Sequence, residues 1–301
     1  MLIKRPDLAK KPWTSPALVG AEVLPSIPVT QNTDDIYFML ADTPTVSGPT
    51  SGRANTDALG VNDNALGSIT YALVSKEYRA FRSSRGILPQ MEEKTKEELA
   101  IVGKNRVAFL IEKARADLLY DAGTPVTSVS DSAFVKNIKT AVRSVRSKGS
   151  PAVVIMSSTT FDTICEMSAF TSSIGKNITA ATGNPNAQPE DYAAIQMAAV
   201  FGCRKVLVGQ NTAWDAGQTN AASVVVCALP NPALDPTAEP KLGGVLVKQE
   251  FFEDELTPFT CEEGYDDNRK GPFVDTSAFI DPKLMNEVLA VVVKLPAEAS
   301  V

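Results

Sequence analysis

One long segment, residues 92–121, contains no proline and a single glycine, and it constrains the fold more than any other feature. Acidic residues open it, where a helix dipole favours negative charge. The spacing of its apolar and small residues predicts a helix of about 30 residues, roughly 45 Å long, ended by Gly123 and Pro125. Its expected buried stripe comprises Leu99, Gly103, Val107, Leu110 or Ile111, Ala114 and Leu118.

The first 33 residues do not read as a domain. Five prolines interrupt every candidate helix or central strand there, and the apolar side chains between them are isolated. Such a segment cannot bury itself, so we expect an arm that lies on a surface of its own subunit or of a neighbour, and that becomes ordered only in the assembled shell.

Residues 34–88 are predicted to form an extended loop built as a β-hairpin. Its strands are expected at 35–41 and 68–81, joined by a tip rich in Thr, Ser, Gly and Asn. A hairpin this long is marginal in isolation and needs support from outside. Because the tip offers little to pack, deleting residues 45–66 is expected to leave a folded subunit that assembles poorly.

The rest of the chain mixes helix and strand patterns, which favours an α+β fold. A second helix is expected at 131–148, with Ser130 or Asp131 as its cap. Further helices are expected at 159–170 and 189–202, and strands at 152–156, 204–209, 223–229, 244–252 and 287–294.

Histidine is absent from all 301 residues, which removes the commonest general base and every His-ligated metal site. The four cysteines form no CxxC pair, and no nucleotide-binding glycine motif is present. We therefore expect no metal, no cofactor and no enzymatic activity. No apolar run reaches the ~18 residues of a membrane helix, and the first residues lack a secretory signal, so a cytoplasmic origin is expected.

Charge is segregated along the chain. Residues 1–12 carry a net charge of +3, residues 13–75 carry −5, residues 76–148 carry +6 and residues 149–301 carry −10. Blocks of opposite sign suit contacts between copies of one chain, although unrelated solvated faces would give the same distribution.

The order of arm, hairpin, long helix, second helix and mixed α and β resembles the major capsid proteins of tailed bacteriophages, whose Hong Kong 97-type fold is shared with encapsulins. Residues 194–209 are the most telling, because a small-residue helix, a Phe-Gly turn and a Val-Leu-Val-Gly strand are similar to the family's axial domain. The resemblance implies these divisions: N-terminal arm 1–33, extended β-hairpin loop 34–88, spine helix and peripheral domain 89–158, axial domain with returning peripheral strands 159–285, and C-terminal strand 286–301.

The resemblance also implies a function. The subunit would self-assemble, as hexamers and pentamers, into the icosahedral head around double-stranded DNA, as a virion protein made in the host cytoplasm. Portal, scaffold and decoration (cement) proteins would be further partners. An encapsulin-like cargo compartment is the alternative, and a carboxylate-dependent hydrolase is a third reading. Some family members crosslink neighbours through a lysine of the extended loop, but no lysine lies between Lys11 and Lys76, so we expect no such bond.

Two charged segments supply candidate site residues. The run 250–267 holds eight acids and no base. A paired-carboxylate hydrolase site or a calcium site would need such acids. A segment that faces solvent or an interface explains the run better. The helix 131–148 carries bases that would face a neighbour, solvent or packaged DNA without sequence reading. The bases are Lys136, Lys139, Arg143, Arg146 and Lys148.

Candidate contacts between subunits come from both charge blocks. We expect reversal of the arginines at 79, 82 and 85 to block assembly without unfolding the subunit, because the acids of a neighbour would lose their partners. The candidates are Trp13, Arg53, Arg79, Arg82, Arg85, Glu253, Asp254, Glu255, Glu262 and Glu263.

Overall fold

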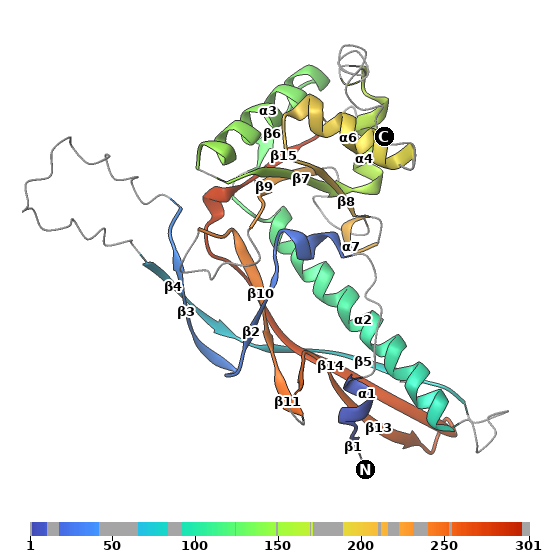
Figure 1. Ribbon diagram of the computed structural model, residues 1–301. Coiled ribbons are helices and arrows are strands. Elements are labelled where there is room, and N and C mark those ends of the chain that lie inside the picture. The colour runs from blue at the N-terminus through green and yellow to red at the C-terminus, as the bar shows by residue number, and fades with distance from the viewer. Residues whose placement is uncertain are drawn as a thin grey trace, which may run out of the picture.

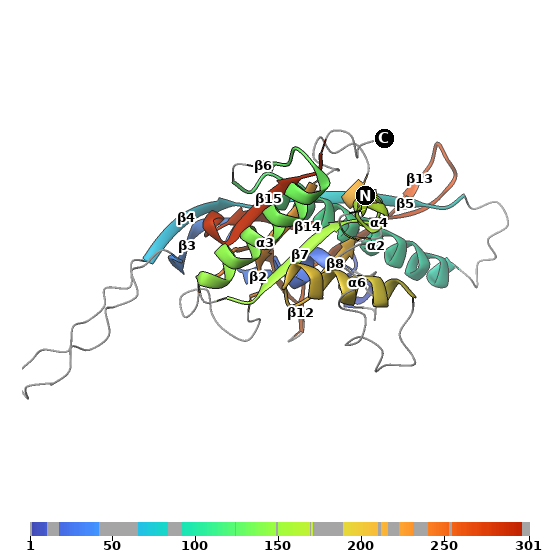
Figure 2. The same ribbon diagram turned by 90° about the horizontal axis from the view of Figure 1, so that it is seen from above.

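The computed structural model describes residues 2–10, 18–41, 66–83, 92–123, 125–148, 150–168, 170, 189–209, 212–215, 223–230, 240–252 and 255–296. These residues form two sheets with their helices, joined by one long helix, and a hairpin that projects to one side (Figure 1). Seen from above, the molecule is a thin layer with this hairpin at one end (Figure 2).

The long helix α2 (Glu92–Tyr120) confirms the predicted proline-free helix, and Gly123 follows it with a φ of 68°. The first half of the predicted stripe is buried, namely Leu99, Gly103, Val107 and Ile111. The rest of the stripe is only half-buried, at Leu110, Ala114 and Leu118. The buried face also holds three charged side chains, Lys104, Glu112 and Arg115.

One face of α2 packs on the lower sheet of Figure 1, whose strand order is β1-β13-β14-β10-β2, with β5 also paired to β14. The strands are β1 (Ile3–Lys4), β2 (Ser26–Val29), β5 (Val74–Phe81), β10 (Gly243–Lys248), β13 (Thr260–Asp266) and β14 (Gly271–Leu284). Alternate residues of β14 are buried against α2 and its surroundings, as a period of two requires: Val274, Thr276, Ala278 and Ile280. The residues between them lie on the opposite face of the sheet.

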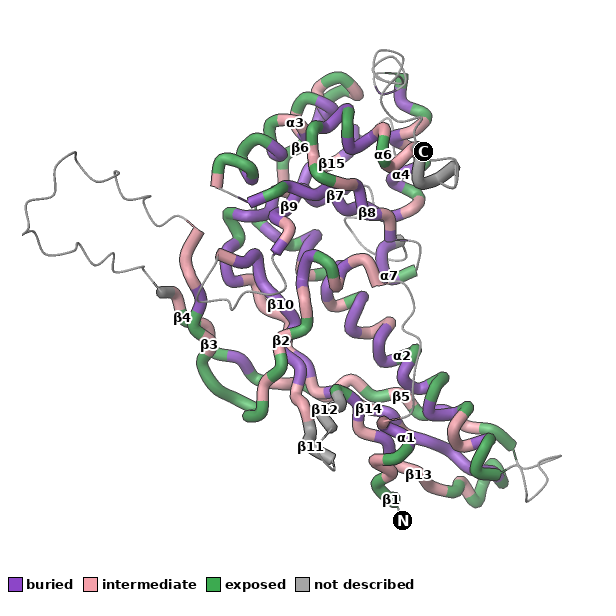
Figure 3. Tube along the Cα trace, viewed as in Figure 1, coloured by how far each residue is buried: buried purple, intermediate pink, exposed green. Residues whose placement is uncertain are grey.

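The upper sheet has the order β6-β15-β9-β7-β8. Its strands are β6 (Val126–Thr127), β7 (Ala152–Ser157), β8 (Val206–Gly209), β9 (Ser223–Ala228) and β15 (Ala290–Lys294). The surrounding helices are α3 (Asp131–Ser147), α4 (Ser158–Glu166), α6 (Pro189–Phe201), α7 (Thr212–Asp215), and the 3₁₀ turns η1 (Val19–Glu22) and η4 (Glu287–Leu289). Every residue of β7 and β9 is buried, so this sheet forms the centre of the main core (Figure 3).

Several predicted elements are confirmed with shifted ends. The predicted helix 159–170 stops at Glu166, because Met167 adopts an extended backbone with a ψ of 130°. The predicted strand 244–252 is divided between β10 and β11 (Glu250–Phe252), and the predicted strand 287–294 starts with η4. The N-cap of α3 is Ser130, whose hydroxyl accepts a hydrogen bond from the Ala133 amide at 3.3 Å.

The predicted hairpin is present but shorter than expected. Strands β3 (Thr33–Met39) and β4 (Leu66–Ala72) pair in antiparallel register from Thr33–Ala72 to Met39–Leu66. The predicted strand 68–81 divides at Leu73, whose amide donates to the Asn32 carbonyl at 2.9 Å. Its second part, β5, leaves the hairpin and pairs with β14, so it belongs to the lower sheet.

The sequence pattern missed the longest strand of the described chain, β14, and its partner β13. Charged residues and two prolines within β14 interrupt the apolar alternation that identifies a strand. The acidic run 250–267 therefore holds structural strands: β11, β12 (Glu255–Thr257) and β13, with Cys261 of β13 buried at 1% exposure. The acidic side chains of β13 are half-buried, and the prediction of a solvated or interface-facing segment stays untested.

The described parts of residues 1–33 pack on their own subunit, which is one of the two surfaces expected, so the argument that they are ordered only in the assembled shell is wrong for these parts. Helix α1 (Pro6–Lys10) buries Leu8 against α2, and β1 extends the sheet beside β13. Val23 and Leu24 are fully buried in the main core, and β2 pairs in parallel with β10. The arm thus lies on its own subunit.

The proposed division of the chain into domains remains a prediction, but one grouping differs from the packing. It places residues 131–158 with the spine helix in the peripheral domain. In the structure α3 contacts β9, β15 and β7, and β7 is a central strand of the upper sheet. Both elements therefore pack with the residues assigned to the axial domain.

The contact between α2 and β14 gives a first prediction, the substitution Gly103→Ala. A Cβ at Gly103 would lie 2.2 Å from the Thr276 hydroxyl oxygen and 2.8 Å from its Cβ. Alanine gains about 1 kcal/mol of helix propensity, but the overpacking is expected to cost more and leave a net loss of roughly 1–2 kcal/mol. Urea unfolding measures this, and a stabilised variant would show that the helix can move away from the strand.

Candidate assembly surfaces

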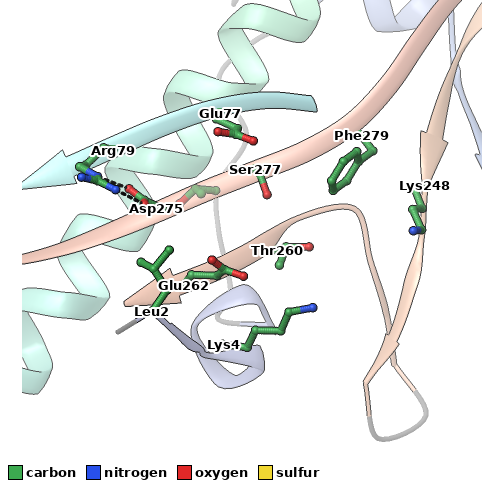
Figure 4. Close-up of a pocket in the computed structure, with 11 residues that line it drawn as sticks. Leu2, Lys4, Glu77, Arg79, Lys248, Thr260, Glu262, Asp275, Ser277 and Phe279 are labelled. Carbon is green, nitrogen blue, oxygen red and sulfur yellow. Dashed lines mark hydrogen bonds and ion pairs between the residues drawn. The ribbon is translucent and has the colours of Figure 1, made fainter. Parts of the chain in front are cut away.

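The face of the lower sheet that points away from α2 carries a groove with a volume of about 470 Å³. Strand β14 supplies its floor through Asp275, Ser277 and Phe279, which alternate with the residues buried under α2 (Figure 4). Three cations and three carboxylates from five strands line it: Lys4, Arg79, Lys248, Glu77, Glu262 and Asp275. The groove is therefore polar and balanced in charge.

Arg79 and Asp275 lie opposite each other on β5 and β14 and are joined by two hydrogen bonds. The Arg79 Nε and Nη2 donate to the two carboxylate oxygens, each at 2.7 Å, and the guanidinium stacks 4.1 Å above the Phe273 ring. Hydrogen bonding to Asp275 raises the pKa of Arg79. Arg79 is thus held within its own subunit by a bidentate pair and an aromatic ring.

Other predicted contact residues also have partners within the chain. Arg82 pairs with Glu98 of α2 at 2.9 Å, with both side chains about half exposed. Glu263 pairs with Arg5 and, at 3.3 Å, with Lys96. Arg5 also bonds Asp7 at 2.7 Å and Glu93 at 3.1 Å, and its hydrogen bonds lower the pKa of both carboxyls. This network fastens the first residues to the start of α2.

The structure therefore brings together residues that the charge blocks assigned to different subunits. Arg79 and Glu262 line the same groove, and neither Arg79 nor Arg82 needs an acid from a neighbour. Glu255 lies in β12. The remaining candidates, Trp13, Arg53, Arg85, Glu253 and Asp254, lie outside the described residues. As contacts between subunits, all these residues stay predictions.

This arrangement changes the expected result of reversing Arg79. Arg79→Glu places two carboxylates opposite each other on β5 and β14, so we expect it to destabilise the subunit itself by about 1 kcal/mol. The double variant Arg79→Glu/Asp275→Arg should recover most of that loss in urea unfolding. A single variant of normal stability that fails to assemble would instead support the contact with a neighbouring subunit.

A buried ionic network at the junction of the two sheets was not anticipated. Glu112 and Arg115 of α2 are 0% and 2% exposed. A Glu112 oxygen accepts from the Gly20 amide at 2.8 Å and from the Trp214 indole at 3.0 Å. Arg115 donates to the Leu24 carbonyl at 2.9 Å and the Ser26 hydroxyl at 2.8 Å, and its Nη1 lies 3.6 Å from the other Glu112 oxygen.

This network links the arm, the spine helix and α7, because Gly20 lies in η1 and Trp214 in α7. Burial lowers the pKa of Arg115, and the adjacent Glu112 carboxylate opposes that shift. The one available sequence indication was the i, i+3 spacing of two opposite charges on a helix, which is ordinarily a solvent-exposed pair. Only the apolar segments packed around it, distant in sequence, mark it as buried.

The predicted basic residues of α3 do not all share one surface. Lys136, Lys139, Arg143 and Arg146 follow at spacings of three, four and three residues, so they share one face; we call them the α3 stripe. Lys139 is half-buried and the other three are exposed. Lys148 is the C-cap residue and is not part of the stripe.

Within the described residues, no group of three or more metal-ligating side chains occurs, and no helix is long and apolar enough to cross a membrane. Burial raises the pKa of all four cysteine thiols, that of Cys203 to about 11. Thiols of this kind stay protonated at neutral pH and are poor nucleophiles.

No protein-family model matches the sequence, and no curated protein matches it significantly. Solved structures do match along nearly the whole chain. A phage-related protein from Bordetella bronchiseptica has a TM-score of 0.66 at 17% identity, with 98% of this chain and 97% of that chain covered. A virus-like particle from Pyrococcus furiosus has a TM-score of 0.54 at 10% identity, with 96% and 95% covered.

The mature capsid of bacteriophage PhiM1 matches with a TM-score of 0.52 at 12% identity, covering 96% of this chain and 90% of that chain. The chain has the mixed α+β fold of tailed-phage capsid proteins, the Hong Kong 97-type fold.

Proposed function

We propose that this chain is the major capsid protein of a tailed phage, which self-assembles as hexamers and pentamers into the icosahedral head around double-stranded DNA. The observation that carries the proposal is the match to a mature phage capsid over 96% of the chain, with no large part left for another function. The protein would then reside in the virion after synthesis in the host cytoplasm. Portal, scaffold and decoration proteins would be its further partners.

Two structural features support a subunit that functions in a shell. The molecule is a thin layer, and the strands of its projecting hairpin pair with each other rather than with either main sheet (Figures 1 and 2). Isolated two-stranded hairpins are marginal in water, so a contact with another copy would stabilise this one. Stable interfaces between subunits of this type commonly bury more than ~2,000 Å².

The groove gives little support to a carboxylate-dependent hydrolase. A paired-carboxylate site needs one carboxyl to donate a proton and the other to remain free for attack or for activating water. Asp275 instead accepts two hydrogen bonds from Arg79, and Arg79 lies against it on the neighbouring strand. The groove therefore contains a structural ion pair among its lining residues.

A cargo compartment of the encapsulin type is the second candidate, favoured by the match to the virus-like particle. Electron microscopy of the purified chain tests both candidates, since both predict closed shells of uniform size. A chain that remains monomeric at its highest soluble concentration, alone and with its scaffold protein, contradicts both. Nuclease-resistant DNA inside native particles supports the phage head, whereas an enclosed enzyme supports the compartment.

A further inference from the structure

The positive charges of the α3 stripe are not neutralised by acids within the described part of the subunit. None of its four side chains takes part in an ion pair with the described residues, although most of the arginines elsewhere in that part do. The apolar side of α3 packs on the upper sheet through Phe134, Ile138, Val142 and Val145. The stripe is thus held at a fixed place by a buried face and presents unneutralised charge.

The chemistry of the surface indicates what it binds. None of the exposed large apolar side chains in the described residues belongs to α3. Lasting interfaces between protein subunits have a desolvated apolar centre, which this face lacks. It offers only cationic groups on long side chains, so its partner must be held by charge, as a polyanion is.

The spacing favours a phosphodiester backbone. From Lys136 to Arg146 the stripe extends about 15 Å, and about nine phosphates lie along the same length of duplex DNA. Apart from the buried Phe134, α3 carries no aromatic side chain. The Asn137 amide nitrogen donates a hydrogen bond to the Ser128 hydroxyl at 3.1 Å. The surface therefore has no aromatic group to stack on bases, and its one amide nitrogen is already engaged; the cations that remain suit phosphates.

We propose that the α3 stripe is a sequence-independent binding surface for the phosphate backbone of double-stranded DNA. This inference rests on the proposed shell function for the source of that DNA, which would be the packaged genome. Four cations placed on phosphates would release about four condensed counterions, so binding should depend steeply on salt and little on sequence. If the proposal is correct, the upper sheet presents α3 to the enclosed DNA.

Fluorescence anisotropy of the full-length chain with a labelled duplex of about 20 base pairs tests the proposal. The logarithm of the affinity should fall against the logarithm of salt concentration with a slope near −3.6, or about 150-fold between 50 and 200 mM. The variant Lys136→Gln/Lys139→Gln/Arg143→Gln/Arg146→Gln should lose nearly all of this slope. Glutamine suits a helix, so the fold should be unchanged.

A matched control removes two lysines and two arginines elsewhere. The exposed residues Lys94, Arg106, Lys113 and Arg204 change net charge by the same amount when replaced by glutamine. This control should keep the steep salt dependence. If both variants lose it equally, binding follows net charge alone and the proposed surface is wrong.

Particle formation separates this proposal from the shell function. The α3 variant should still form particles, since the stripe is not assigned to a contact between subunits. If the variant keeps DNA binding but no longer forms particles, α3 is an interface between copies and the inference is overturned. If the unmodified chain forms no particles yet binds DNA through the stripe, the shell function fails and the DNA-binding surface stands.

Discussion

Glu112→Ala is expected to destabilise the subunit by about 3–5 kcal/mol, which is a large part of the 5–15 kcal/mol that holds an ordinary domain together. The substitution leaves the Arg115 guanidinium buried at 2% exposure without a counter-charge. It also removes the acceptor of the Gly20 amide and of the Trp214 indole. Removing one partner of a buried pair costs far more than the pair itself contributes.

Urea unfolding of two further variants identifies the cause of that loss. Glu112→Leu/Arg115→Met removes both charges at similar volume, so its loss should be smaller than the sum of the two single losses. Some loss remains, because the Gly20 amide, the Trp214 indole and the Leu24 carbonyl each lose a partner. A coupling energy near zero would show that the two residues act independently.

Glu98→Ala is the matched control on the same helix. Glu98 pairs with Arg82 at 2.9 Å, but its side chain is 52% exposed. The pair is screened by water and salt, so its loss should change the free energy of unfolding by less than about 1 kcal/mol. If Glu112→Ala costs no more than Glu98→Ala, the buried network does not hold the two sheets together.

The sequence predicted those elements whose evidence is local. Helix α2 is a long proline-free segment, α3 has a cap, a periodic apolar face and a stop, and β7 and β9 are short apolar runs. In each case residues within one turn or one strand carry the information. The chain order of these elements was enough for the resemblance to capsid proteins.

The elements that the sequence missed depend on distant partners. Strand β14 lies among four neighbours, β5, β10, β13 and α2, and their packing outweighs its charges and its two prolines. The arm was expected to become ordered only in the assembled shell because its apolar groups are scattered. Val23 and Leu24 are nevertheless fully buried, in a core made by segments up to 270 residues away.

The charge blocks did not indicate the ion pairs within the subunit, for a related reason. A net charge along the sequence says nothing about which acids and bases meet in space. Arg79 and Asp275 are 196 residues apart and yet lie opposite each other on neighbouring strands. The α3 stripe is the exception, since its four bases are neighbours on one helix and the spacing alone places them together.

Excision of the hairpin tip should abolish shell formation while leaving the subunit folded. Leu66 belongs to β4 and pairs with Met39, so the cut must end before residue 66 and is shifted toward the N-terminus. Replacing residues 42–63 with Asn-Gly joins Ala41 to Asn64 through a type I′ turn in the existing register. It also keeps the hydrogen bond from the Ala41 amide to Asn286 at 2.8 Å.

The expected result follows from what the two parts of the hairpin contribute. Strands β3 and β4 remain paired in the shortened chain. Their side chains Phe38 and Tyr71 are 5% and 4% exposed, and this burial is kept. The excised segment has few large apolar residues among its polar ones, and its loss should change the melting temperature by only a few degrees. A shell, by contrast, uses the same contact in every subunit, so its loss acts on all copies at once.

Circular dichroism and electron microscopy of the shortened chain decide between three results. A normal melt without particles supports the tip as an assembly element. Normal particles show that the shell forms without it, and loss of folding places it in the core. In a second variant, a Gly-Ser linker of equal length replaces residues 42–63. Such a linker keeps the span of the tip but makes no specific side-chain contact. If this variant forms particles, assembly depends on the length of the tip and not on its amino-acid sequence.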